Sequence, residues 1–169
     1  MCRPGPVISA KGSPSVFSQT VEYAMRAVLA LAASDGAPVT TRQIAETMRV
    51  PQSYLSKVLQ ALVRGGLVFS TRGLRGGFVL TRPPEQINLL EIMDVVNPIR
   101  RIEHCPLDLE GHSSQLCPLH RRLDQAMAMV QEAFASTTLA ELLSENNPCP
   151  TLKGQLQSLR PYGLEPKRD

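Results

Sequence analysis

Cysteine and histidine side chains gather in one short segment of this chain. The seventeen residues HCPLDLEGHSSQLCPLH include two of the four cysteines and every histidine, namely His104, Cys105, His112, Cys117 and His120. Thiolates and imidazoles are ligands of zinc and iron, because both displace water from these metals. The segment therefore predicts a metal centre, and an ordinary polar loop is the alternative interpretation.

Length and composition indicate one compact domain with appendages. The chain has 169 residues, 43% of them hydrophobic and none of them tryptophan, which favours a helix-rich domain. No apolar run approaches the roughly 18 to 20 residues that cross a bilayer, and the first residues, MCRPGPVISAKGSPS, have no secretory core. We therefore expect a cytoplasmic protein without membrane contact. Thiols stay reduced there, so paired cysteines indicate metal binding or redox chemistry before disulfides.

Positive charge is concentrated in one part of the chain. The net charge is only +3, yet residues 42–82 contain seven basic residues and a single acid, Glu46. This part carries +6 and leaves −3 for the remainder of the chain. A confined basic region is typical of a surface that binds a polyanion such as DNA, and a merely solvated face is the alternative.

Two helices separated by a short turn lie inside this basic region. Thr40 and Gln43 form a capping box that opens the first helix, which buries Ile44, Ala45 and Met48. Pro51 suits the first turn of the second helix, which ends at Gly65-Gly66. The second helix buries its apolar face, made of Leu55, Val58, Leu59 and Leu62. The pair predicts a helix-turn-helix.

A β-hairpin follows the helix pair. The runs LVFS and FVL are β-prone, and TRGLRGG between them has the glycines of a hairpin tip. A nucleotide loop of this kind would instead lie between a strand and a helix. Helix-turn-helix plus hairpin is a winged helix, whose second helix enters the major groove while the tip reaches phosphates or the minor groove. The candidate DNA-binding residues are Thr41, Arg42, Gln52, Ser53, Tyr54, Ser56, Lys57, Gln60, Arg72 and Arg75.

The remaining periodic segments are also helical. Ser18 caps an amphipathic helix over SQTVEYAMRAVLALAAS, and Asn88 with Glu91 opens a short helix that stops before Pro98. From about Leu119 a longer helix follows, and Thr138 caps LAELL. The longer helix has an apolar stripe, made of Leu123, Ala126, Met127, Val130, Ala133 and Phe134. A stripe longer than the small core needs indicates a dimer interface, and two-fold pairing suits DNA half-sites.

These motifs occur together in a known family. The runs YAMRAVLALA, TTRQIAETMRVPQSYLSKVLQALVRGGLVFSTRGLRGGFVLTRPPEQINLLEIMDVV, CPLH and STTLAELL resemble the small bacterial winged-helix regulators that include IscR, NsrR and CymR. The match covers roughly residues 17–143. The resemblance implies a mainly α homodimeric transcription factor with a long dimerisation helix. Its sensor members hold an iron-sulfur cluster between the DNA-binding and dimerisation parts.

The resemblance also assigns metal ligands. The family segment has three cysteines; Cys105 and Cys117 match the first and third, and His120 matches a histidine of some members, whereas the middle position is Gly111. His112 stands beside that position. Some relatives add a carboxylate from the partner subunit, which matches Glu22, and an ion pair of Glu22 with Arg26 is the alternative. The expected cofactor is a 2Fe-2S cluster; zinc, or no metal, are the alternatives.

The resemblance and the composition together predict the organisation of the chain. We expect a flexible extension over 1–16, a winged-helix domain over 17–98, a cluster-binding loop over 99–118, a dimerisation region over 119–143 and a flexible tail over 144–169. The function expected is a regulator that binds a duplex operator and senses redox state, nitric oxide or iron. A cluster-free regulator controlled by a protein partner or zinc is the alternative. A metalloenzyme is disfavoured, because no nucleophile or general base accompanies the Cys and His residues.

Overall fold

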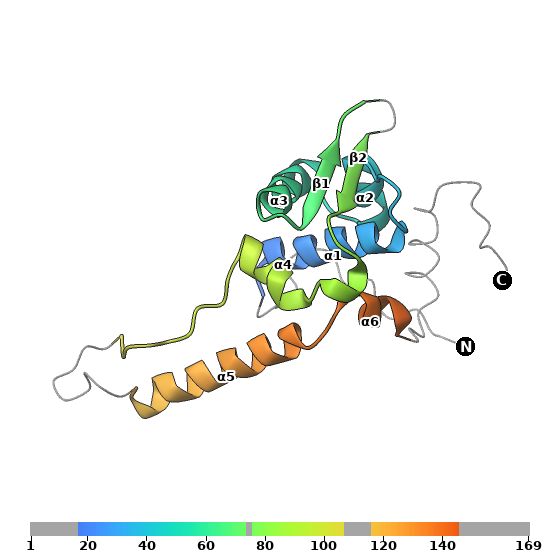
Figure 1. Ribbon diagram of the computed structural model, residues 1–169. Helices are drawn as coiled ribbons and strands as arrows, with labels where there is room; N and C mark the ends of the chain where they lie inside the picture. Colours follow the sequence, from blue (N-terminus) through green and yellow to red (C-terminus); the bar gives the residue numbers. More distant parts are fainter. Residues whose placement is uncertain (1–16, 74–75, 107–115, 146–169) are drawn as a thin grey trace, which may run out of the picture.

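The computed structural model describes residues 17–73, 76–106 and 116–145, which form a mainly helical protein with one small antiparallel sheet (Figure 1). The predicted extension 1–16 and nearly all of the tail lie outside these residues. The elements are α1 (Gln19–Ala33), α2 (Thr41–Met48), α3 (Gln52–Arg64), β1 (Val68–Thr71), β2 (Gly77–Leu80), η1 (Pro84–Gln86), α4 (Leu89–Val96), α5 (Pro118–Ala135) and α6 (Leu139–Ser144).

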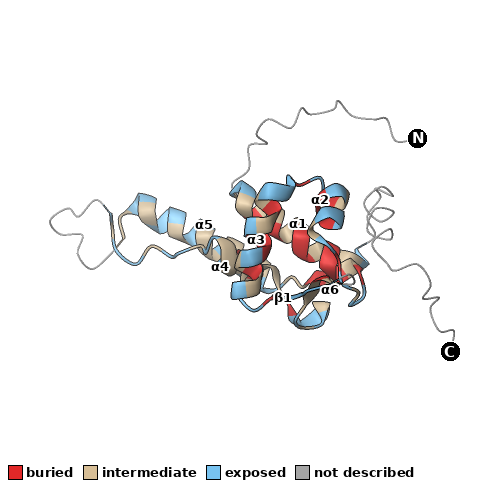
Figure 2. Ribbon diagram, turned by 90° about the horizontal axis from the view of Figure 1, so that it is seen from above, coloured by how far each residue is buried: buried red, intermediate tan, exposed pale blue. Residues whose placement is uncertain are grey.

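Helix α1 is the centre of the core. Ser18 caps it by accepting a hydrogen bond from the backbone N–H of Val21, as the sequence predicted. Its buried side consists of small and branched residues, including Ala24, Ala27 and Val28, all of which are fully buried. Small residues let α2, α3, α4 and α6 approach closely, and all four pack against α1. Figure 2 shows the buried residues concentrated here.

The helix-turn-helix is formed by α2 and α3. The predicted capping box of Thr40 and Gln43 is present at the start of α2. Pro51 is the cap of α3 and not part of its first turn, because helical geometry begins at Gln52. The four predicted apolar residues of α3, Leu55, Val58, Leu59 and Leu62, are all buried. Burial of this stripe fixes which face of α3 remains in solvent.

The wing is formed by β1 and β2, which pair antiparallel with Val68 opposite Leu80. Val39, before α2, adds a bridge to Phe78 through backbone hydrogen bonds of 3.0 and 2.9 Å. Gly77 lies against this bridge, where an added Cβ would be 2.9 Å from the Val39 backbone. The close approach requires glycine, and it ties the base of the wing to the helix-turn-helix.

Helices α4 and α6 close the other side of the domain. Their capping boxes, at Asn88 and Thr138, are both present. The two caps form an isolated bridge, in which the Leu139 N–H donates to the Ile87 carbonyl at 3.0 Å. Leu139 is fully buried in the core. Helix α6 thus packs with the DNA-binding domain, so the predicted 119–143 region joins two elements with different surroundings.

Helix α5 extends away from the rest of the domain (Figure 1). It has 18 residues and none of them is buried. Leu119 and Leu123 are 61% and 45% exposed. Residues 98–106, here called the linker, run from α4 toward the free end of α5. An amphipathic helix without a buried face lacks the packing that normally stabilises it within one chain.

Candidate nucleic-acid interface and metal centre

The outer face of α3 is polar and exposed, as the sequence predicted. Gln52, Ser53, Lys57 and Gln60 are exposed on this face. Ser56 is half-buried and its hydroxyl donates to the Gln52 carbonyl at 3.0 Å, so it is already engaged within the helix. The exposed amides and the ammonium group can donate and accept hydrogen bonds at base edges and phosphates.

Tyr54 differs from its neighbours on α3. Its ring is half-buried and meets the edge of Tyr23, with ring centroids 5.4 Å apart. Its hydroxyl lies 2.5 Å from the Thr20 hydroxyl on α1. These contacts hold α3, the second helix of the helix-turn-helix and here called the recognition helix, on α1. Tyr54 thus holds the face that carries Lys57 against α1, and its contact with DNA stays a prediction.

Ion pairs divide the basic region into engaged and available cations. Arg42 donates to Glu46 at 2.8 Å, and Arg82 is paired with Glu91 of α4. Thr41, beside Arg42 in the first turn of α2, is half-buried. Among the described residues of this region, the cations without a hydrogen bond or ion pair from their side chains are Arg49, Lys57, Arg64 and Arg72. All four are exposed, so their charges remain available to an anionic partner.

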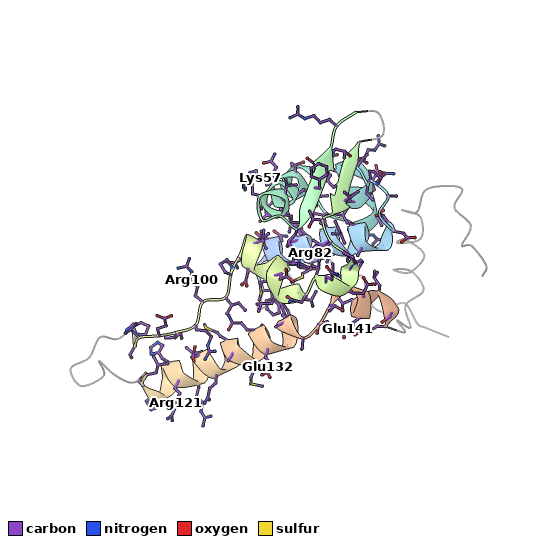
Figure 3. All side chains as sticks on the ribbon, in the orientation of Figure 1. Lys57, Arg82, Arg100, Arg121, Glu132 and Glu141 are labelled. Carbon is purple, nitrogen blue, oxygen red and sulfur yellow. The ribbon has the colours of Figure 1, made fainter. Side chains whose placement is uncertain are left out.

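The wing presents Arg72 next to its tip. Arg72 is exposed and follows Thr71, whose hydroxyl accepts a hydrogen bond from the Gly77 N–H at 3.1 Å across the hairpin. The bond holds the strand ends together at the base of the tip. Arg75, the other predicted residue of the tip, lies outside the described residues. In Figure 3 the recognition helix with Lys57 and the wing occupy the same end of the molecule, opposite α5.

Three predicted metal ligands meet beside the free end of α5. The Nδ1 atom of His120 lies 3.1 Å from the Cys117 Sγ and 3.5 Å from the Cys105 Sγ. All three donor atoms lie within 4.8 Å of one another. Cys117 caps α5 and Pro118 is its first residue, so His120 projects from the first turn onto the thiol. The fold thus brings Cys105 next to Cys117 and His120, which follow it by 12 and 15 positions along the chain.

The linker is fastened along α5 by side chains that the sequence reasoning missed. Gln131 donates to the Ile99 carbonyl at 3.0 Å, and Asp124 accepts from the Ile102 N–H at 3.0 Å and from Arg101 Nε at 2.6 Å. Cys117, Asp124 and Gln131 follow one another at seven-residue intervals. That spacing places them on one face of a helix, and it is the pattern in the sequence that could have indicated a surface for the linker.

The Asp124 carboxylate is an acceptor for the linker backbone and for the guanidinium. The Arg101 hydrogen bond, followed by the bond from the Ile102 N–H, lowers the pKa of Asp124 to about 2 from its ordinary value of 3.8. Asp124 is 15% exposed and Arg101 45% exposed. The carboxylate is therefore ionised near neutral pH, and it holds the linker where Cys105 can face His120.

The donor set fits a small metal ion or one iron of a cluster. Tetrahedral zinc has bonds of about 2.3 Å to sulfur and 2.0 to 2.1 Å to nitrogen, which separates neighbouring ligand atoms by roughly 3.5 to 4 Å. The distances from His120 to the two thiols, 3.1 and 3.5 Å, approach that range. A Cys, Cys and His set is soft enough for zinc or iron. It leaves a fourth ligand position.

Among the described residues, Glu22 is not part of this group. Glu22 is paired with Arg26 on α1, which is the alternative interpretation of that residue. Arg26 also donates to the Met48 carbonyl at 3.2 Å, at the end of α2. His112 lies outside the described residues, and His104 is exposed.

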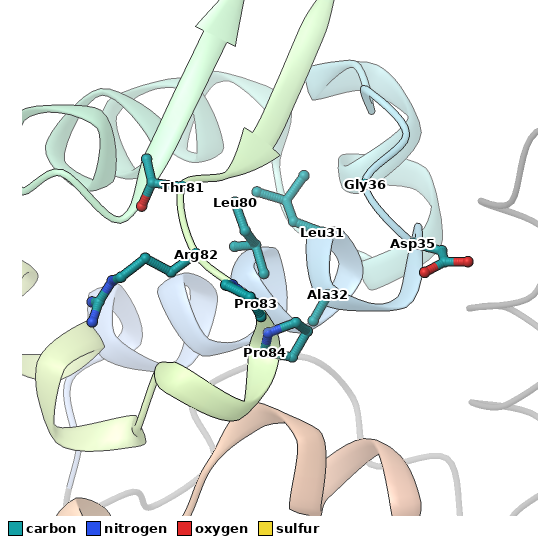
Figure 4. A pocket seen from close by; sticks show the side chains of 9 residues that line it. All are labelled: Leu31, Ala32, Asp35, Gly36, Leu80, Thr81, Arg82, Pro83 and Pro84. Carbon is teal, nitrogen blue, oxygen red and sulfur yellow. The ribbon is translucent and has the colours of Figure 1, made fainter.

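Two cavities lie on the described surface. One, of about 410 Å³, lies below the wing and is lined mainly by apolar groups such as Leu31, Leu80 and Pro83. In Figure 4 its two charged residues, Asp35 and Arg82, point away from each other, so no polar groups converge on a ligand. The other, of about 440 Å³, separates the apolar stripe of α5 from α1 and α4. It shows that the stripe is incompletely covered within one chain.

Fold and site together define a winged-helix DNA-binding regulator. The sequence profile of the Rrf2 family, described as an iron-dependent transcriptional regulator, matches residues 17–145. The chain belongs to the Rrf2 family of transcriptional regulators, and it is not an enzyme. The expected fold class and family are thus confirmed.

Individual relatives agree with this assignment. A protein of Aquifex aeolicus that carries the name of an HTH-type transcriptional regulator is 30% identical over 132 residues, covering 76% of this chain and 92% of that protein. One of Haemophilus influenzae with the same kind of name is 32% identical over 126 residues, covering 74% and 84%.

Solved structures show the same fold. CymR, the global cysteine regulator of B. subtilis, superposes with a TM-score of 0.61 at 30% identity, covering 78% of this chain and 98% of CymR. IscR of T. potens superposes with a TM-score of 0.62 at 27% identity, covering 79% and 90%. Within the described ranges, no helix combines the length and apolarity needed to traverse a bilayer.

Proposed function

We propose that this chain is a homodimeric transcriptional regulator whose affinity for its operator is controlled by an iron-sulfur cluster of the 2Fe-2S type. The observation that carries the proposal is the meeting of Cys105, Cys117 and His120 where the linker reaches α5. The family description as iron-dependent supports iron over zinc. The fourth position is open to His112 or to Glu22 of the partner subunit, the latter after release from Arg26.

The described contacts support a route from this centre to DNA. Cys105 ends a linker that starts at α4, and α4 packs against α1 and α3. When bound, the cluster supplies a redox-active or nitric oxide-reactive group that ties the linker to α5. Loss of that tie leaves Asp124 and Gln131 as the remaining linker clamps. Changed linker order alters the orientation of the two recognition helices, a local event that biases a two-state element.

The exposed stripe of α5 supports the dimer. Leu123 is 45% exposed, and the stripe lines the 440 Å³ cavity against α1 and α4. A second copy would cover this apolar surface and relate two winged helices by a two-fold axis. Two half-sites on a duplex operator then bind together, which raises affinity beyond that of one domain.

The metal proposal is tested by anaerobic purification and reconstitution with iron and sulfide. We expect visible charge-transfer absorption, with two irons and two sulfides per chain, in the wild type. Cys105→Ala, Cys117→Ala and His120→Ala should lose most of this absorption, while His104→Ala, at an exposed position, should keep it. Wild-type protein that takes up zinc alone, or no metal, contradicts the cluster.

The regulatory proposal is tested by mobility shift on the DNA upstream of the gene. Loaded and metal-free wild type should differ in operator affinity, and binding should fall steeply with added salt because phosphate contacts release counterions. Cys117→Ala is the matched control, and its affinity for the operator should not depend on treatment with iron and sulfide. Equal affinity of both wild-type forms contradicts control by the cluster.

A cluster-free regulator is the second candidate. The similarity to CymR, a global cysteine regulator by its name, favours it. The Gly111 position, where the family cysteine is absent, also favours it. In that case the isolated protein binds DNA without metal and responds to a protein partner or to zinc.

A further inference from the structure

We propose that Arg49, in the turn between α2 and α3, is a further DNA-binding residue that contacts a backbone phosphate at the edge of the operator major groove. The inference rests on the DNA binding of this regulator and is independent of the metal centre. It starts from a backbone conformation and not from the charge pattern.

Arg49 adopts a left-handed conformation. It ends α2 with φ 53° and ψ 47°, and its N–H donates to the Ala45 carbonyl. Val50 N–H donates to the same carbonyl at 3.0 Å. Glycine is the residue that adopts this helix-ending conformation without crowding by a Cβ atom. An arginine here carries a conformational cost that glycine would remove.

Packing within the chain does not account for the arginine. Met48 and Val50 on either side are each 5% exposed and belong to the core, whereas Arg49 is exposed. Among the described residues the Arg49 guanidinium has no hydrogen bond, ion pair or ring contact. The other described non-glycine residue with positive φ is Asp35, and aspartate tolerates this region through its short polar side chain.

The charge of Arg49 is not balanced nearby. Glu46, one turn earlier on α2, is engaged by Arg42. Glu22 is engaged by Arg26, whose guanidinium reaches the Met48 carbonyl beside the turn. Both of these acids are thus paired with other arginines, and among the described residues Arg49 has no carboxylate partner.

The position of the turn identifies the partner. Arg49 lies three residues before Gln52, the first residue of α3. A recognition helix enters the major groove with its amino-terminal residues leading, which brings the preceding turn beside the phosphates that border the groove. An arginine binds phosphate with charge-assisted, often bidentate hydrogen bonds. DNA binding therefore explains an otherwise unfavourable residue.

The experiment compares Arg49→Gly, Arg49→Ala and Arg49→Lys for thermal stability and DNA affinity. Arg49→Gly should raise Tm by about 2 to 4 °C, because it relieves the left-handed strain. It should also weaken binding to operator and to unrelated duplex by the same factor. The slope of log affinity against log salt should fall by about 0.9 for each bound subunit, and hence by about 1.8 for a dimer on two half-sites. Arg49→Ala should weaken binding equally without the gain in Tm, and Arg49→Lys should retain the wild-type salt slope.

Asp35→Gly is the matched control, since it relieves a similar conformation with φ 54° after α1 and outside the turn between α2 and α3. It should not weaken DNA binding. Wild-type affinity and slope in Arg49→Gly and Arg49→Ala overturn the inference, whatever their Tm. Failure of the wild type to bind any duplex would instead contradict DNA binding as a whole.

Discussion

At the scale of single residues, charge is organised by pairing as much as by number. Four arginines are held by acids of the same chain, whereas Lys57 and Arg72 are not. A guanidinium engaged by a carboxylate must give up that partner before it binds phosphate, so we expect the unpaired cations to carry more of the affinity for DNA. Arg42, which is also a predicted DNA contact, is one of the arginines held by an acid, in its case Glu46.

The bond between Tyr54 and Thr20, which holds α3 on α1, can be tested by substitution. Tyr54→Phe removes the hydrogen bond to Thr20 and keeps the ring against Tyr23. We expect a loss of about 1 kcal/mol in the free energy of unfolding, measured in urea. Thr20→Val should cost a similar amount, and the double variant should cost less than the sum, because both remove one bond. Additive losses would contradict the bond.

The Asp124 carboxylate predicts a pH dependence at the linker. Its pKa is lowered to about 2, mainly by Arg101, so the folded state favours the ionised form. The resulting stabilisation is fully present above about pH 4, is lost as the pH falls through 2, and salt screens it. Chemical-shift titration of Asp124 should give a midpoint well below 3.8, and Arg101→Gln should move it upward. A midpoint unchanged by Arg101→Gln would contradict this cause.

At the scale of elements, close contacts decide how the helices meet. Gly65 ends α3 directly against α4, where an added Cβ would lie 2.4 Å from a Val95 methyl carbon. The recognition helix is therefore seated on the helix that leads into the linker. This contact is one physical connection between the candidate metal centre and the DNA-binding face.

Gly65→Ala tests that contact. The new methyl group must displace Val95, and overpacking of this kind costs about 1 to 3 kcal/mol of unfolding free energy. Gly65→Ala combined with Val95→Ala should recover part of the loss, because the second change makes room. The contact between α3 and α4 would be contradicted by an unchanged unfolding free energy in Gly65→Ala. It would also be contradicted if the double variant were no more stable than Gly65→Ala.

At the scale of the whole molecule, α5 has an apolar stripe that the rest of the chain covers incompletely. None of its residues is buried, yet its stripe faces a 440 Å³ cavity lined by α1 and α4. The linker runs along α5, held by Asp124 and Gln131, and its residue Ile99 lines the same cavity. One chain alone thus leaves the apolar face incompletely covered, which is the physical basis for expecting a dimer.

The dimer is tested by Leu123→Lys, which places a charge on the stripe. We expect sedimentation equilibrium to show monomers for this variant and dimers for the wild type, because burying an unpaired ammonium is costly. Glu132→Lys, at an exposed position of the same helix, is the matched control and should remain dimeric. A dimeric Leu123→Lys would contradict the stripe as the interface.

Local physical chemistry made much of the fold predictable. Capping boxes at Thr40, Asn88 and Thr138 and the buried stripe of α3 depend on neighbours within four residues, so their spacing is visible in the sequence. The crowding of Cys105, Cys117 and His120 in one segment was likewise readable as a metal site, and these three donor atoms meet in the structure. The choice among cluster, zinc and no metal stays a prediction.

Contacts between distant parts of the chain were decided only by tertiary structure. The engagement of Tyr54 by Thr20, of Arg82 by Glu91 and of α6 by the core joins residues whose sequence spacing carries no sign of their pairing. The left-handed Arg49 is equally silent in the sequence, since arginine gives no signal for that conformation. The sequence by itself determined which helices form and which faces are apolar. Packing decided which polar groups are engaged within the protein and which stay exposed to solvent.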